Sequence, residues 1–208
     1  MPGLKPHDIE VRSMAIIDGL LPPGDWSAGE RTVVKRLVHT SGDPSLATAV
    51  RFSPGAVAAG VAALRADATV LTDTHMVRAG VNQSRVQALG GTVECLIADE
   101  GVAAEAKRSG RTRAACAMRA FGPRLSGAVV ALGNAPTALR EVLALVAEGV
   151  ARPALVIGMP VGFVDAAESK DALMASDLAY VAIEGTRGGS PLAAATVNAL
   201  MRVCEGEA

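Results

Sequence analysis

Five short apolar runs, separated by longer amphipathic stretches, constrain the fold of this chain more than any other feature of its sequence. Each run is nearly continuous in aliphatic or β-branched residues and is bounded by Gly, Pro, Asn or Asp. Such runs are typical of strands buried on both faces of a parallel sheet, with helices covering those faces. We therefore predict an α/β fold built on one doubly wound, mainly parallel, five-stranded sheet. The runs are ATVLTD (68–73), TVECLIAD (92–99), AVVALGN (128–134), ALVIGMP (154–160) and AYVAIEG (179–185).

The segment ahead of the first run predicts helices. Ser27 and Glu30 form a capping box that begins a helix through residues 31–39, and the Gly-Asp-Pro sequence at 42–44 ends it. We find no linker that would separate two domains. The sequence therefore predicts a single domain over residues 1–208 with a helical N-terminal segment.

Ligands of doubly wound sheets bind beyond the carboxyl ends of the strands, which directs attention to the segments that follow the runs. These segments are rich in small residues, which let a ligand approach the backbone closely. Two of them contain candidate helix starts, at 134–136 and 190–191, and helix N-termini favour anions. The alternative is that they are simply efficient turns. None matches a dinucleotide-binding or Walker loop, so the sequence disfavours nucleotide binding.

His39 lies close to the end of the predicted helix and on its polar side. At 100° per residue, Val33, Val34, Leu37 and Val38 form one apolar stripe, and His39 points nearly opposite to it. The residue is therefore either a solvated side chain at a helix end or a proton donor held towards a ligand. Because histidine titrates near neutral pH, the pattern permits acid–base catalysis without deciding for it.

Other candidate residues carry less information. Asp73 and His75 alternate after a strand, but two ligands do not make a zinc or iron site. Arg111 and Arg113 stand in the sequence GRTRAACAM at 110–118. They fit a solvated face and a clamp for carboxylates equally well.

Composition excludes several classes of protein. A net charge of −1 and an aromatic content of 2% argue against nucleic acid as a partner. The three cysteines show no metal-binding spacing and predict a reduced, cytoplasmic protein. The N-terminal stretch lacks a signal-peptide pattern, and the longest apolar run is too short for a bilayer, so we expect no membrane association.

Eight segments spread over nearly the whole chain resemble the precorrin-8X methylmutases, which are called cobalt-precorrin-8 methylmutases in the anaerobic route. The segments GNAPTAL and GMPVGFV, the latter followed by AAESK, are the most specific when they occur in this order. The eight are IEVRSMAII (9–17), RLVHTSGD (36–43), FSPGAV (52–57), TDTHMVRAGV (72–81), GRTRAACAM (110–118), ALGNAPTALREVL (131–143), IGMPVGFVDAAESKDAL (157–173) and RGGSPLAAATVNAL (187–200).

This resemblance implies an isomerase of corrin (cobalamin) biosynthesis with a flavodoxin-like fold. It would move a methyl group from C-11 to C-12 of a tetrapyrrole by an acid-catalysed 1,5-sigmatropic shift. The substrate would be precorrin-8X, giving hydrogenobyrinate, or cobalt-precorrin-8, giving cobyrinate. The resemblance assigns proton transfer to His39 and substrate contacts to Ser13, Arg36, Thr112 and Arg113.

The resemblance also implies a homodimer with its sites near the interface, and neither a cofactor nor a catalytic metal. Hand-over of the product to the next enzyme of the corrin pathway is a further expectation. A different class of function stays open, namely a non-catalytic carrier that holds a labile tetrapyrrole. A hydrolase on the same scaffold is remote, because the chain lacks a G-x-S-x-G elbow.

Overall fold

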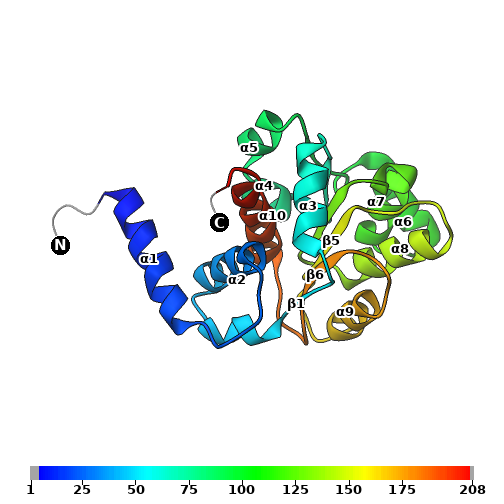
Figure 1. Cartoon of the computed structure of the whole chain (residues 1–208). Coiled ribbons are helices and arrows are strands. Elements are labelled where there is room, and N and C mark those ends of the chain that lie inside the picture. Colours follow the sequence, from blue (N-terminus) through cyan, green and yellow to red (C-terminus); the bar gives the residue numbers. More distant parts are fainter. Residues whose placement is uncertain (1–4, 207–208) are drawn as a thin grey trace.

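A single sheet of six strands runs through the middle of the molecule (Figure 1). This computed structural model describes residues 5–206. The two ends of the predicted domain, 1–4 and 207–208, therefore lie outside the described residues. The first four residues of the N-terminal stretch, in which we looked for a signal peptide, lie outside them too. The strands lie in the order β1-β6-β5-β4-β2-β3. Their bounds are β1 (Val50–Phe52), β2 (Val70–Thr72), β3 (Val93–Cys95), β4 (Val129–Leu132), β5 (Leu155–Gly158) and β6 (Tyr180–Ile183).

The five predicted runs form strands β2 to β6, which pair in parallel with one another. Counted along the chain, these five strands have the spatial order 2-1-3-4-5, which is the flavodoxin-like order. The predicted doubly wound α/β fold is thereby confirmed. The count of five strands was too low, because β1 adds a sixth that pairs antiparallel with β6 and aligns Val50 with Ile183.

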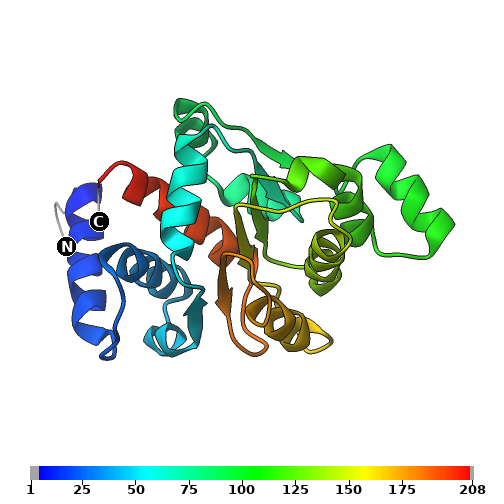
Figure 2. The ribbon, with the colours of Figure 1, turned by 45° about the vertical axis from the view of Figure 1, so that its right-hand side comes forward.

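Helices cover both faces of the sheet (Figures 1 and 2). Strand β4 serves both layers, because successive side chains of a strand point to opposite faces. Val129 and Ala131 pack into the core on the side of α2, α3, α4, α5 and α10, whereas Val130 and Leu132 pack on the side of α6 to α9. The bounds of the first group are α2 (Ala28–Ser41), α3 (Ala56–Arg65), α4 (His75–Gly80), α5 (Gln83–Ala88) and α10 (Ser190–Cys204). Those of the second are α6 (Glu100–Ser109), α7 (Arg113–Phe121), α8 (Pro136–Ala147) and α9 (Ala166–Met174), with a 3-10 turn, η2 (Gly122–Leu125), after α7.

The N-terminal segment places a further helix, α1 (Pro6–Leu20), against α2 at the edge of the molecule (Figures 1 and 2). The predicted capping box begins α2: the Ser27 hydroxyl accepts from the Glu30 N–H, and the Glu30 carboxylate accepts from the Ser27 N–H. Gly42 ends the helix with a φ of 66°, a left-handed conformation that favours glycine. A 3-10 turn, η1 (Pro44–Ala49), then leads into β1. The predicted helical N-terminal segment is confirmed.

Candidate functional site

His39 lies in the last turn of α2, where it meets α1. Its side chain is exposed, and the stripe on the opposite side of the helix, from Val33 to Val38, is buried in the core. The prediction that His39 is not a core histidine is thus confirmed. Its Nδ1 atom lies 3.0 Å from the hydroxyl oxygen of Ser13 on α1. Two residues that are 26 positions apart in the sequence therefore form one polar pair.

The hydroxyl of Ser13 suits a histidine that changes its protonation state. A serine hydroxyl both donates and accepts hydrogen bonds. It can donate to Nδ1 of a neutral imidazole and accept from Nδ1–H of an imidazolium. The ring can therefore keep one orientation in both states, with Nε2 as the atom available to a ligand.

Arg36 lies one turn before His39 on α2, and the Glu10 carboxylate of α1 joins it to Arg202 of α10. Its guanidinium and that of Arg202 donate to the same Glu10 oxygen, Arg202 at 2.8 Å. The Arg36 guanidinium beside Glu10 holds the pKa of that carboxyl below its ordinary value, although partial burial opposes the effect. Three helices thus contribute charged groups next to His39, and the Glu10 carboxylate shows that the two guanidinium groups can receive an anion.

The other two predicted contact residues lie on the opposite side of the sheet. Thr112 is the N-cap of α7, where its hydroxyl accepts from the Ala115 N–H and lies 2.7 Å from the hydroxyl of Thr137. Arg113, the first residue of α7, is exposed, and its side chain forms no ion pair or hydrogen bond among residues 5–206. One chain therefore brings Ser13, Arg36 and His39 together, but not Thr112 and Arg113.

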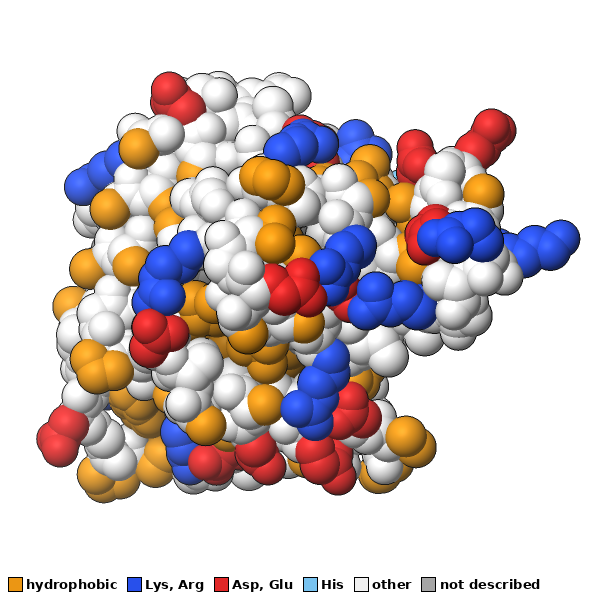
Figure 3. All heavy atoms as spheres, turned by 90° about the vertical axis from the view of Figure 1, so that its right-hand side faces the viewer, with side chains coloured by type: hydrophobic (Ala, Val, Ile, Leu, Met, Phe, Trp, Pro, Cys, Tyr) orange, Lys and Arg blue, Asp and Glu red, His pale blue; other side chains and the backbone are white. Residues whose placement is uncertain are grey.

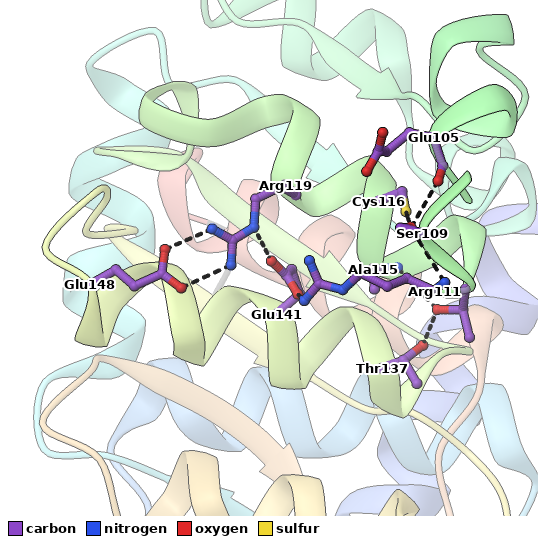
Figure 4. A network of polar contacts seen from close by, with 10 residues as sticks. Glu105, Ser109, Arg111, Ala115, Cys116, Arg119, Thr137, Glu141 and Glu148 are labelled. Atoms are coloured by element: carbon purple, nitrogen blue, oxygen red, sulfur yellow. Dashed lines mark hydrogen bonds and ion pairs between the residues drawn. The ribbon is translucent and has the colours of Figure 1, made fainter. Parts of the chain in front are cut away.

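The neighbouring arginine, Arg111, has a structural role that the sequence did not reveal. It and Arg119 both bind the carboxylate of Glu141, which is only 3% exposed, and Arg119 also binds Glu148 (Figure 4). Over this side of the molecule, basic and acidic side chains lie next to one another (Figure 3). The sequence left two interpretations open for Arg111 and Arg113, a clamp for carboxylates or a solvated face. In the structure Arg111 is paired within the chain, whereas the side chain of Arg113 is available to a ligand.

One of the two candidate helix starts at the strand exits, that at 134–136, is engaged by the chain itself. The Asp73 carboxylate, which follows β2 and is fully buried, accepts from the N–H groups of Gly133, Asn134 and Ala135 at 2.8 to 3.1 Å. Burial raises the pKa of Asp73, and these three donors act in the opposite direction. The helix start at 134–136 is therefore unavailable to a substrate anion.

Two further properties of the described residues bear on function. No three His, Cys, Asp or Glu side chains within residues 5–206 are grouped so that they could hold a metal ion. The helices in the same range all fall short of the length and apolarity that crossing a bilayer requires. The Asp73 and His75 pair accordingly gains no third ligand in this part of the chain.

Comparison with known proteins decides the family. The model of the precorrin-8X methylmutase family matches residues 8–203. The chain belongs to the precorrin-8X methylmutase family. A cobalt-precorrin-8 methylmutase of Priestia megaterium is 40% identical over 197 residues, which are 95% of this chain and 88% of that protein. A precorrin-8X methylmutase of Pseudomonas aeruginosa is 47% identical over 167 residues, covering 79% of this chain and 80% of that protein.

Solved structures agree with this assignment. The precorrin-8X methylmutase of Thermus thermophilus superimposes with a TM-score of 0.90 and 40% identity, covering 97% of each chain. The chain is therefore an isomerase of cobalamin biosynthesis that transfers a methyl group within its substrate. The non-catalytic carrier finds no support, since these relatives are all named as methylmutases.

Two charged residues beside Arg36, Glu10 and Arg202, escaped the sequence analysis. Glu10 stands three positions before Ser13 on the same helix, so its nearness to Ser13 could have been inferred from helical spacing. Arg202 is 192 positions away from its partner Glu10. Only the packing of α10 against α2 brings it to the site, and no local signal in the sequence shows that.

Proposed function

We propose that this chain converts precorrin-8X, or its cobalt form, into the corresponding corrin by moving a methyl group from C-11 to C-12, with His39 as the proton donor and acceptor. The observation that carries the proposal is the hydrogen bond of 3.0 Å between Ser13 and the exposed imidazole of His39. It fixes the ring at Nδ1 and reserves Nε2 for the substrate.

The reaction needs a proton that is given and then returned. The imidazolium of His39 donates its Nε2 proton to a ring nitrogen of the tetrapyrrole, which makes the macrocycle electron-poor. The bond between the methyl group and C-11 then breaks as its bond to C-12 forms, and the conjugated double bonds shift in the same concerted step. The ring nitrogen then returns the proton to Nε2. Substrate and product have the same composition, so His39 ends in its starting state. Ser13 is a positioning residue that accepts from Nδ1–H while His39 is charged.

Arg36 supports binding through charge. A tetrapyrrole of this class carries many carboxylates, while the chain has a net charge of −1. Local guanidinium groups must therefore hold the ligand, and charge-assisted hydrogen bonds are the strong ones. Arg36 lies one turn before His39 on the same helix, and this position supports its assignment as a substrate contact.

We also propose a homodimer in which a second copy supplies Thr112 and Arg113. Helix α1 exposes an apolar stripe of Ile9 at 53%, Ile16 at 55% and Leu20 at 55%. At 100° per residue Ser13 lies next to this stripe, so a partner that covers the stripe also borders the Ser13–His39 pair. Thr112 and Arg113 lie on the other side of the sheet from His39 of the same chain. In a dimer they would instead contact the substrate held at His39 of the partner chain.

Two experiments test these proposals. The purified protein, incubated separately with precorrin-8X and cobalt-precorrin-8, should change the absorption spectrum to that of the corrin with one or both. Absence of conversion of either form would refute the proposed substrate class. The dimer is tested by mixing inactive His39→Asn chains with inactive Arg113→Glu chains under exchange. Each mixed dimer should regain activity at one of its two sites, the one that combines the intact His39 of one chain with the intact Arg113 of the other. If each site were built within one chain, every mixture would stay inactive.

We place this reaction in the cytoplasm, and we propose that the product is handed to the next corrin-pathway enzyme. The three cysteines, Cys95, Cys116 and Cys204, are all free thiols, which fits a reducing compartment. Hand-over is tested by supplying the purified enzyme that consumes the corrin next in the pathway. Faster release of product in its presence than with a chemical trap would support direct transfer.

A further inference from the structure

A polar groove runs along α10 between α2 and the start of α5. It measures about 250 Å³, and nearly all the side chains that line it carry N–H or O–H donors. No Asp or Glu lines it within the described range of the chain. The donors come from Arg36, Thr40, Asn82, Arg85, Asn198 and Arg202. A groove with this lining favours an anion with several acceptor oxygens.

The two amides of the groove are held in place by the backbone. The Asn198 side chain accepts from the Asn82 N–H at 2.8 Å and donates to the Gly80 carbonyl at 2.9 Å. The Asn82 side-chain oxygen accepts from the Arg85 N–H at 3.2 Å as the N-cap of α5. The Nδ2 hydrogens of Asn82 therefore have no partner in the part of the chain that the structure describes. These donors are fixed before any ligand arrives.

The groove begins beside His39. Arg36 and Thr40 line it, and they flank His39 on the exposed side of α2. At one end, Arg36 and Arg202 bind the carboxylate of Glu10, so the donors left for a ligand are those farther along the groove. Arg85 lies along the same groove and is partly exposed, with Glu205 at 3.2 Å.

We propose that this groove binds a peripheral carboxylate of the tetrapyrrole, with Arg85 and Asn82 as further substrate-binding residues. The inference rests on the proposed function, which places the macrocycle over His39. From there a carboxylate arm reaches past Arg36 and Thr40 into the groove. Arg85 supplies the charge, and Asn82 and Asn198 supply the neutral donors. A ligand with the same ring but without charged arms would lose this anchor.

The test compares two variants with a matched control on the intact protein. Arg85→Gln removes one charge, and Asn82→Asp keeps the oxygen that caps α5 while replacing the amide donors with a carboxylate. Arg152→Gln is the control, because Arg152 also forms an exposed ion pair, with Asp177, and lines a different hollow that contains no residue of α2 or α10. The probes are hydrogenobyrinate and its fully methyl-esterified form, titrated by corrin absorption, together with KM for precorrin-8X.

We expect each groove variant to weaken hydrogenobyrinate binding and to raise KM by about tenfold, the usual loss for one charge-assisted hydrogen bond. Binding of the ester should be the same in both variants and in the wild type, and the control should match the wild type with both probes. Unchanged affinity for the acid, or an equal loss for acid and ester, would overturn the proposal. A wild type that binds the acid but converts no substrate would refute the proposed function instead, and the binding comparison would still decide on the groove.

Discussion

Replacing His39 and Ser13, singly and together, tests the proposed mechanism most directly. His39→Asn should lower kcat by 10²- to 10⁴-fold, the usual contribution of general acid catalysis, which corresponds to about 2.7–5.4 kcal/mol. Ser13→Ala removes a single exposed hydrogen bond of 3.0 Å. Such a bond contributes about 0.5–1.5 kcal/mol, so kcat should fall only about two- to twelvefold.

The double variant separates positioning from an independent contribution. If Ser13 acts only by orienting the imidazole, then Ser13→Ala should cost nothing more once His39 is already Asn, because the two residues act as a unit. Ser13→Thr keeps the hydroxyl and should restore most of the activity that Ser13→Ala loses. None of these changes should alter the unfolding free energy by more than about 1 kcal/mol, since His39 is exposed.

The measurement is spectroscopic conversion of precorrin-8X at saturating substrate, with binding titrated in parallel on the same preparations. Near-wild-type turnover by His39→Asn would refute the proton transfer. Additive losses in the double variant would instead show that Ser13 touches the substrate by itself. Loss of binding in parallel with loss of turnover would show that His39 holds the ligand in its ground state.

Three further predictions concern stability and assembly. Asp73→Asn should lower the unfolding free energy measured in urea by about 2–4 kcal/mol. The amide accepts with one oxygen only and turns its own N–H towards a backbone donor. An unchanged urea midpoint would contradict this role of Asp73. Burial lowers the pKa of Lys170 from 10.5 to about 8. Between these two pH values the unfolded chain therefore binds more protons than the folded chain does. The unfolding free energy should accordingly rise from pH 8 to 10.5, by up to about 3 kcal/mol. Lys170→Met should remove that rise in urea unfolding across this pH range. Ile16→Glu should convert the proposed dimer to a monomer in light scattering, whereas Val150→Glu, also on an exposed apolar residue, should not.

The sequence predicted the sheet well because its parallel strands are buried on both faces. Four-residue strands such as β4 and β5 are buried at every position, which leaves the continuous apolar runs that the prediction used. Strand β1 lacks that signal. It is three residues long, contains Arg51, and lies at the edge of the sheet, where only its pairing with β6 makes it a strand. That pairing depends on contacts more than a hundred positions away in the chain, which no local pattern reports.

The site was predictable only where one helix carries the information. The apolar stripe of α2 was enough to show that His39 faces outward. Its contact with Ser13 and the convergence of Arg36 and Arg202 on Glu10 depend on how α1 and α10 pack against α2, so the sequence alone could not reveal them. The resemblance to a family supplied Ser13 and Arg36 as residues, whereas the structure supplied their nearness to His39.

The hydrogen bonds of Asp73 bear on where an anionic ligand can bind. In doubly wound sheets the crevice at the carboxyl ends of the strands forms where consecutive connections leave in opposite directions, which here is between β2 and β4. Asp73 crosses that crevice and takes the three N–H donors that would otherwise attract an anion. With those three donors engaged, other N–H and O–H donors lie in the groove along α10, from Arg36 to Arg85. An open surface of this kind suits a broad, flat macrocycle better than a crevice between two strands, and it leaves the other side of the ligand to the second copy that we propose.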